Sequence, residues 1–149
     1  IMEQKHEIYP IPVFVSLAVK DLEKSLDWYH KLGFVTIFEL RGPDGELKGT
    51  HVRLGKYQDF NLVRAGENFQ NPGQGVRIYL LREIEDIDAL AEELANMGVN
   101  IAEGPVDRPW NLREIVISDP DGYRFVFGKV INTHINFEEV VKNMREGVP

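Results

Sequence analysis

DLEKSLDWYHKLG (residues 21–33) and DIDALAEELANMG (residues 86–98) decide the fold, because they are two copies of one amphipathic helix. In each copy, apolar residues recur at helical spacing between an aspartate that starts the helix and a glycine that ends it. A stretch rich in valine, isoleucine and leucine precedes each copy, as expected of a strand. We therefore predict helices over residues 21–32 and 86–97, each following a strand.

The two copies belong to a longer repeat, with an offset of 65 residues from Gly33 to Gly98. Carried along the chain without gaps, this offset also pairs Val52 with Ile117 and matches the turns that follow them. Each half then reads strand, helix and three further strands. The predicted strands are 11–19, 34–41, 47–55 and 58–65 in the first half, and 76–84, 99–103, 112–118 and 123–130 in the second.

Two βαβββ modules are too few for a solenoid, so we expect them to pair. The predicted fold class is α+β, with two paired βαβββ modules forming a curled, cup-like mixed sheet. A C-terminal segment, FEEVVKNMREG, is amphipathic and predicts a short helix that packs on the body or on a partner subunit. The predicted boundaries are 11–66 for the first module, 67–75 for a linker, 76–131 for the second module and 132–149 for the helical tail.

Composition and short motifs limit the compartments, partners and cofactors that we expect for this protein. The chain has no cysteine, which excludes thiol catalysis and favours a reducing compartment, so we expect a cytoplasmic protein. A net charge of −7 argues against nucleic acid as the partner and suits a cationic ligand. The N-terminal stretch lacks the apolar core of a secretory signal, and no window is long enough to span a membrane. Phosphate-loop, zinc-finger and dinucleotide motifs are absent from the sequence, so no cofactor is expected.

Three stretches carry a family resemblance: VFVSLAVKDLEKSLDWYHKLGF near the start, IEDIDALAEELANMGV in the middle and RPWNLREIVISDPDGYRFVF near the end. Over residues 12–130 the chain resembles the vicinal oxygen chelate superfamily, which includes glyoxalase I, extradiol dioxygenases, and fosfomycin- and bleomycin-resistance proteins. The resemblance implies an open cup that holds the ligand, and a homodimer. It does not fix an activity, because one scaffold hosts many functions.

Metal-using members of this superfamily place histidine, glutamine or glutamate at four inward positions. The resemblance puts these positions at Phe14, Asn61, Tyr79 and Val126. This set lacks the donors that divalent metals prefer, so no metal is expected. A slip of two residues in the third of these strands would present Arg77, which is no better as a ligand.

Without a metal, the cup is expected to bind its ligand through aromatic walls and a few polar groups. Trp110 lies in RPWNLRE, which resembles the segment that lines the drug groove of bleomycin-resistance proteins. His51 is the one histidine expected inside the cup, with Glu39 or Glu114 as a candidate partner for acid–base chemistry or a partial metal site. Strand alternation gives the remaining candidates. The predicted ligand-binding residues are Phe14, Ser16, Phe38, His51, Arg53, Asn61, Tyr79, Trp110, Arg113 and Val126.

Three functional hypotheses follow. The first is a metal-free, homodimeric protein of the bleomycin-resistance-like branch, which sequesters a small cationic aromatic molecule such as an antibiotic. The second is a metal-dependent lyase or dioxygenase of the same superfamily that uses a non-standard ligand set including His51. The third is a non-catalytic interaction scaffold whose cup is filled by side chains. The sequence leaves open whether the chain is an enzyme.

Overall fold

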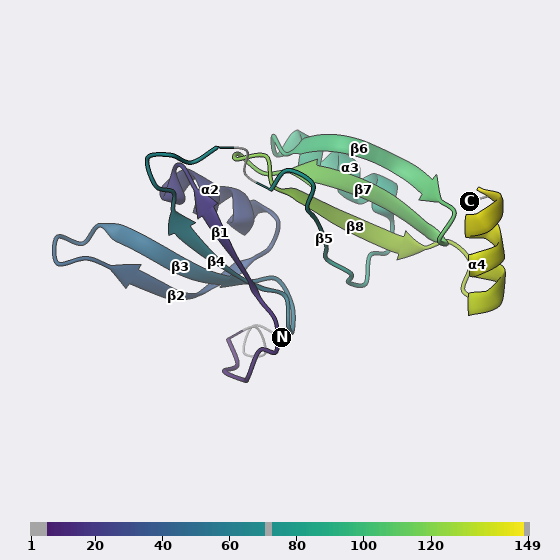
Figure 1. Cartoon of the computed structure of the whole chain (residues 1–149), viewed down its shortest axis with the longest axis horizontal. Helices are drawn as coiled ribbons and strands as arrows, with labels where there is room; N and C mark the ends of the chain where they lie inside the picture. The colour runs from purple at the N-terminus through teal and green to yellow at the C-terminus, as the bar shows by residue number, and fades with distance from the viewer. Residues whose placement is uncertain (1–5, 71–72, 148–149) are drawn as a thin grey trace. The chain divides into compact units, whose positions relative to one another are not determined.

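The computed structural model describes residues 6–70 and 73–147, and the chain divides into two compact units. The first unit runs to Gln74 and also includes the turn Asp119–Tyr123. The second unit takes Gly75–Ser118 and continues from Arg124. Each unit holds one mixed sheet and a helix that precedes its second strand (Figure 1).

The first unit has the strand order β1-β4-β3-β2. Strand β1 is parallel to β4, whereas β4, β3 and β2 are antiparallel neighbours. Helix α2 connects β1 to β2, so the unit is one βαβββ module. Its elements are β1 (Val15–Val19), α2 (Leu22–Lys31), β2 (Val35–Arg41), β3 (Leu47–Arg53) and β4 (Asp59–Arg64).

The second unit repeats this topology with the strand order β5-β8-β7-β6, in which β5 is parallel to β8. The α+β class, with two βαβββ modules and a short C-terminal helix, is therefore confirmed over the described residues. The elements are β5 (Arg77–Tyr79), α3 (Ile87–Asn96), β6 (Asn100–Arg108), β7 (Leu112–Ser118), β8 (Arg124–Val130) and α4 (Phe137–Glu146).

The ends of α2 and α3 follow from their capping residues. The side chains of Asp21 and Asp86 accept hydrogen bonds from backbone N–H groups in the first turns of α2 and α3. Gly33 and Gly98 follow the helices with φ of 96° and 83°, a conformation in which a Cβ atom would be strained. The predicted helices are therefore confirmed to within about one residue at each end.

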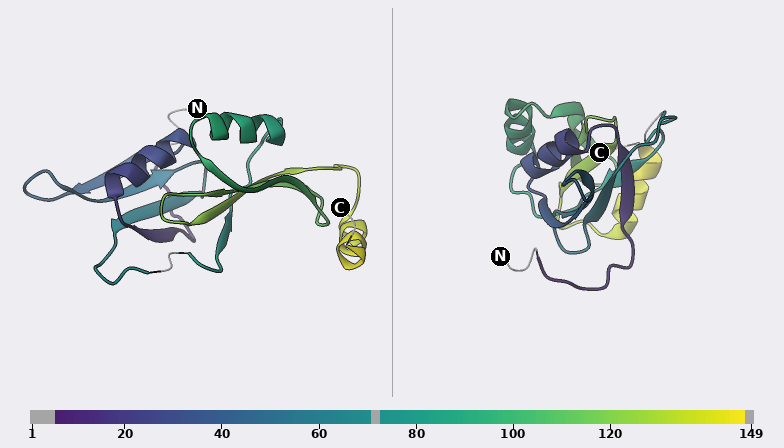
Figure 2. Two further views of the ribbon diagram at one scale, coloured as in Figure 1. Left: turned by 90° about the horizontal axis from the view of Figure 1, so that it is seen from above. Right: turned by 90° about the vertical axis from the view of Figure 1, so that its left-hand side faces the viewer.

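Each helix covers one face of its own sheet. Because side chains alternate along a strand, the strand residues are divided between this covered face and the opposite face. Helix α2 lies over one face of the first sheet, and α3 lies over one face of the second (Figure 2). Helix α2 buries Leu22 and Tyr29, and α3 buries Ile87 and Leu94. Side chains at every second strand position point to this apolar core. The alternate positions lie on what we call the helix-free face of each sheet.

The strand pairings show that the offset of 65 residues between the two modules, which the sequence predicts without gaps, does not hold for the first strand of each module. Phe60 and Phe125 differ by 65 positions, but their strand partners Val15 and Ile78 differ by only 63. Counted from these equivalent positions, α3 begins nine residues after Ile78 (87 − 78) and α2 begins seven residues after Val15 (22 − 15), so the second module has two extra residues before its helix. In consequence Tyr79 corresponds to Ser16 rather than to Phe14.

Three strands differ from their predicted bounds by more than two residues. Strand β1 covers Val15–Val19 instead of 11–19. Strand β5 covers only Arg77–Tyr79 instead of 76–84, because the chain leaves β8 after the Leu80 N–H donates to the Val126 carbonyl. Strand β6 continues past residue 103 to Arg108, since it resumes pairing with β7 after an irregularity in the register.

The turn between β7 and β8 is held by Asp119. Its Oδ1 atom accepts backbone N–H hydrogen bonds from Asp121 at 2.9 Å and Tyr123 at 2.8 Å. Its Oδ2 atom accepts a hydrogen bond of 2.9 Å from the hydroxyl of Tyr29 on α2. Burial is the main cause that raises the pKa of Asp119 to about 6. The turn is therefore fixed to α2 by a largely buried carboxyl group.

Helix α4 stands beyond the end of β8 (Figure 1). None of its residues is buried, and Phe137 is 79% exposed. The prediction that this helix packs on the body is therefore wrong, and packing on a partner subunit stays a prediction. No helix among the described residues is long and apolar enough to cross a membrane.

Candidate functional site

The helix-free face of the first sheet gathers several predicted site residues. His51 on β3 lies opposite Asn61 on β4, and Asn61 lies opposite Ser16 on β1. Phe38 on β2 is the partner of His51 on its other side. Phe14, just before β1, has its ring centroid 6.1 Å from that of His51. The strand register thus brings these five residues together on one surface.

This surface contains a hollow of about 300 Å³ with apolar walls. Phe38 and Leu40 are 57% and 55% exposed, although burial of such side chains is usually favourable. Gly49 contributes no side chain, so the floor of the hollow stays open beside Leu62. The lining residues are Phe38, Leu40, Gly49, Thr50, His51, Asn61, Leu62 and Val63.

His51 is held by a buried carboxylate. Its Nε2 atom lies 2.5 Å from Oδ2 of Asp59, whose side chain is completely buried. Arg53 binds the same carboxylate through two hydrogen bonds, from Nε to Oδ1 at 2.8 Å and from a terminal nitrogen to Oδ2 at 2.9 Å. Asp59 therefore fixes both the position and the tautomer of the imidazole.

Arg53 is a supporting residue in this arrangement. It is only 2% exposed, and the hydrogen bonds with Asp59 raise its pKa. The ring of Tyr9 stacks over its guanidinium at 4.3 Å, and the carbonyl oxygen of Glu7 accepts a further hydrogen bond at 2.5 Å. These contacts hold Arg53 against Asp59 and away from the hollow.

The partner of His51 is thus Asp59, and the predicted alternatives are corrected. Glu39 instead binds the exposed Arg41 through a hydrogen bond of 3.0 Å and an ion pair. Glu114 belongs to the other unit and accepts a hydrogen bond from Trp110.

In the second unit, an ion network covers part of the helix-free face around Trp110. The indole N–H of Trp110 donates to Glu114 at 2.5 Å, and Arg108 donates to the same fully buried carboxylate at 3.2 Å. Arg108 also binds Glu103, which accepts two further hydrogen bonds from Arg77. Hydrogen bonds from Arg77 and Arg108 lower the pKa of Glu103 to about 2. The network fixes Trp110, which is still 38% exposed.

The other predicted site residues of the second unit, which are Tyr79, Val126 and Arg113, do not take part in the network around Trp110. Tyr79 lies beside Val126 on paired strands and is 45% exposed, whereas Val126 is fully buried. Arg113 binds Asp88 on α3 and Asp107 on β6, so its side chain lies on the α3 side of the sheet. Arg113 is therefore separated from Trp110 by the sheet itself.

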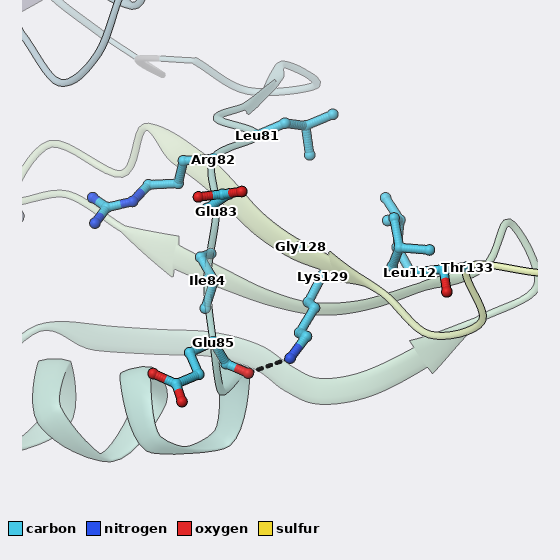
Figure 3. A pocket seen from close by; sticks show the side chains of 10 residues that line it. Leu81, Arg82, Glu83, Ile84, Glu85, Leu112, Gly128, Lys129 and Thr133 are labelled. Carbon is cyan, nitrogen blue, oxygen red and sulfur yellow. Dashed lines mark hydrogen bonds between the residues drawn. The ribbon is translucent and has the colours of Figure 1, made fainter.

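A larger hollow of about 810 Å³ lies where β5 stops beside β8 (Figure 3). Lys129 donates a hydrogen bond across it to the carbonyl oxygen of Glu85. It contains no aromatic side chain and none of the predicted site residues. The lining residues are Leu81, Arg82, Glu83, Ile84, Glu85, Leu112, Gly128, Lys129, Val130 and Thr133.

Asp59 was missed by the sequence prediction, but a signal was available. Arg53 and Asp59 are direct partners across the β3–β4 hairpin. Opposite charges at facing hairpin positions attract, and the predicted strands placed the two residues near the same turn. The network around Glu114 gave no comparable signal, because it joins three strands and a loop.

The residues at the four positions where metal-using members of the superfamily carry their ligands are unsuited to a metal ion. The directly paired residues are Ser16 with Asn61, and Tyr79 with Val126. A hydroxyl, an amide, a phenol and an alkyl group are not a ligand set for a divalent transition metal. Within residues 6–70 and 73–147, no cluster of three or more histidine, cysteine, aspartate or glutamate side chains could hold a metal ion.

Comparison with known proteins agrees with this fold. The model of the Glyoxalase/Bleomycin resistance protein/Dioxygenase superfamily matches residues 11–127, and the chain belongs to this superfamily. A superfamily member from Sphaerobacter thermophilus is 29% identical, with a TM-score of 0.63 over 81% of this chain and 97% of that one. A glyoxalase/bleomycin resistance protein from Streptomyces sp. CB03234 is 29% identical, with a TM-score of 0.58 over 78% and 97%. TnmS3, an antibiotic binding protein from the same organism, is 28% identical, with a TM-score of 0.62 over 83% and 97%.

Proposed function

We propose that this protein binds a small, flat, cationic aromatic molecule on the helix-free face of its first sheet, without a metal, and that it acts by sequestration. The observation that carries this proposal is the apolar hollow, with Phe38 and Leu40 exposed beside the polar groups of His51 and Asn61. Exposed aromatic and aliphatic side chains around a few fixed polar groups are typical of small-molecule sites.

Charge and family membership support the proposal. The net charge of −7 favours a cationic ligand over an anionic one. An aromatic wall such as Phe38 attracts a flat ring and a neighbouring cation. TnmS3, which shares the fold and 28% of its residues, is described as an antibiotic binding protein. An antibiotic is therefore the first ligand class to test, and the homodimer expected from the resemblance stays a prediction.

Isothermal titration with bleomycin and doxorubicin, two cationic aromatic antibiotics, tests the proposal. We expect binding to the wild type and a loss of about fivefold in Phe38→Ala, since one aromatic contact contributes about 1 kcal/mol. Phe137→Ala is the matched control, because Phe137 is an equally large exposed side chain on α4 and does not line the hollow. An affinity that Phe38→Ala leaves unchanged, or no binding of either compound, would contradict the proposed site.

A further inference from the structure

His51 is hydrogen-bonded to the carboxylate of Asp59, and catalytic sites use such histidine–carboxylate pairs for proton transfer. The short contact of 2.5 Å joins Nε2 to a carboxylate whose other oxygen is occupied by Arg53. A carboxylate accepts hydrogen bonds, so the imidazole carries its proton on Nε2. The other ring nitrogen, Nδ1, then has a lone pair, and within the described residues it has no hydrogen-bond partner.

Arg53 supports the pair, and the hollow gives a ligand access to it. Arg53 already supplies one positive charge to Asp59 through two hydrogen bonds. His51 lines the apolar hollow and its side chain is 20% exposed, so a ligand in the hollow can reach it.

We propose that His51 is a metal-independent general base, which removes an acidic proton from a flat aromatic ligand in this hollow while Asp59 acts as its positioning residue. The ligand class is an aromatic carbon acid or phenol. The proposal rests on the proposed binding of an aromatic molecule to the same hollow. A histidine base oriented by a carboxylate needs no cofactor for such a proton transfer.

The base can be tested with 5-nitrobenzisoxazole, a flat aromatic carbon acid. Nδ1 of His51 takes the proton from C3, and the electron pair of the C–H bond becomes the second π bond of a nitrile. The N–O bond breaks, and its electron pair stays on the oxygen as 2-cyano-4-nitrophenolate. The imidazolium then returns its proton to water, so no oxidant or reductant is needed.

The rate of phenolate formation is measured by absorbance for the wild type, His51→Gln and His30→Gln. We expect kcat/KM to fall at least about tenfold in His51→Gln, because general bases contribute factors of this size or more. His30 is an exposed histidine on α2 that bonds Thr36, so His30→Gln should keep the wild-type rate. A rate that is equal in both variants overturns the proposal.

Asp59 is tested by a readout that a purely structural role would not move. We expect Asp59→Asn to lower kcat while KM is unchanged. Because this variant leaves Arg53 without its partner charge, a second measurement uses the wild type: ¹⁵N nuclear magnetic resonance of His51. We expect the Nε2–H tautomer, and a proton on Nδ1 of the neutral ring would overturn the assignment.

Calorimetric binding of 5-nitroindazole, an unreactive analogue, separates this proposal from the proposed function. Binding of the analogue without His51-dependent turnover overturns the general base and leaves the binding site intact. Absence of binding of both the analogue and the antibiotics overturns the site and the base together. Binding with turnover that depends on His51 supports both.

Discussion

Asp119→Asn should change how the stability of the protein depends on pH. In the folded chain, burial raises the pKa of Asp119 from 3.8 to about 6. The folded state therefore keeps a proton over a range in which the unfolded state has released it. The contribution of this group to stability is fully present below about pH 4, and it is lost as the pH rises through 6.

The size of the effect follows from the shift of about two pKa units, which corresponds to about 3 kcal/mol in total. About 2 kcal/mol of this should be lost between pH 4 and pH 7, since part of the loss lies below pH 4. Asparagine keeps an oxygen for the N–H groups of Asp121 and Tyr123, and its amide can donate to the hydroxyl oxygen of Tyr29. The variant is therefore expected to fold.

Urea unfolding at steps of one pH unit from 4 to 8 measures the free energy of unfolding of both proteins. The value for the wild type minus that for Asp119→Asn should fall across this range and level off above about pH 7. Asp44→Asn removes a carboxylate from an exposed turn and is the matched control for the loss of one charge. A difference that stays flat or rises with pH would refute the reasoning.

Other substitutions test the second unit. Trp110→Phe should lower the free energy of unfolding by about 1–3 kcal/mol, because it removes an N–H donor from the fully buried Glu114; an unchanged urea midpoint would count against this. Gly104→Ala should cost about 2–4 kcal/mol in thermal or urea unfolding, since Gly104 has a φ of 85° and a Cβ atom would meet the carbonyl oxygen of Glu114. Arg113→Ala should leave antibiotic affinity unchanged by calorimetry, because Arg113 binds Asp88 on the α3 side of its sheet; a weaker affinity would place it in the site.

Much of the fold is predictable because its signals are local. The aspartate and glycine at the ends of α2 and α3 are read directly from the sequence, and β7 has the predicted bounds Leu112–Ser118. Strand β5 was predicted too long because its end depends on where the chain must leave β8 to reach α3. The end of β5 is therefore set by the path of the chain from β5 to α3 and not by the β propensity of the residues in the strand.

The candidate site is only partly predictable. His51, Asn61 and Phe38 follow from strand alternation and lie together around the hollow. Arg53 also follows the alternation, yet the structure buries it against Asp59, which decides its role. Burial and ion pairing are properties of the whole packed sheet, so a pattern of period two cannot supply them.

The extra two residues between β5 and α3 have a geometric consequence. Because side chains alternate along a strand, an insertion of one residue would have turned the apolar side of β5 toward solvent. An insertion of two keeps Ile78 facing the core, but each position on this strand is taken by the residue two places earlier than the gapless repeat implies, a shift of about 7 Å along the chain. The two modules can therefore differ in the length of this connection while each keeps an intact core. Tyr79 and Ser16, rather than Tyr79 and Phe14, then occupy equivalent positions in the two modules.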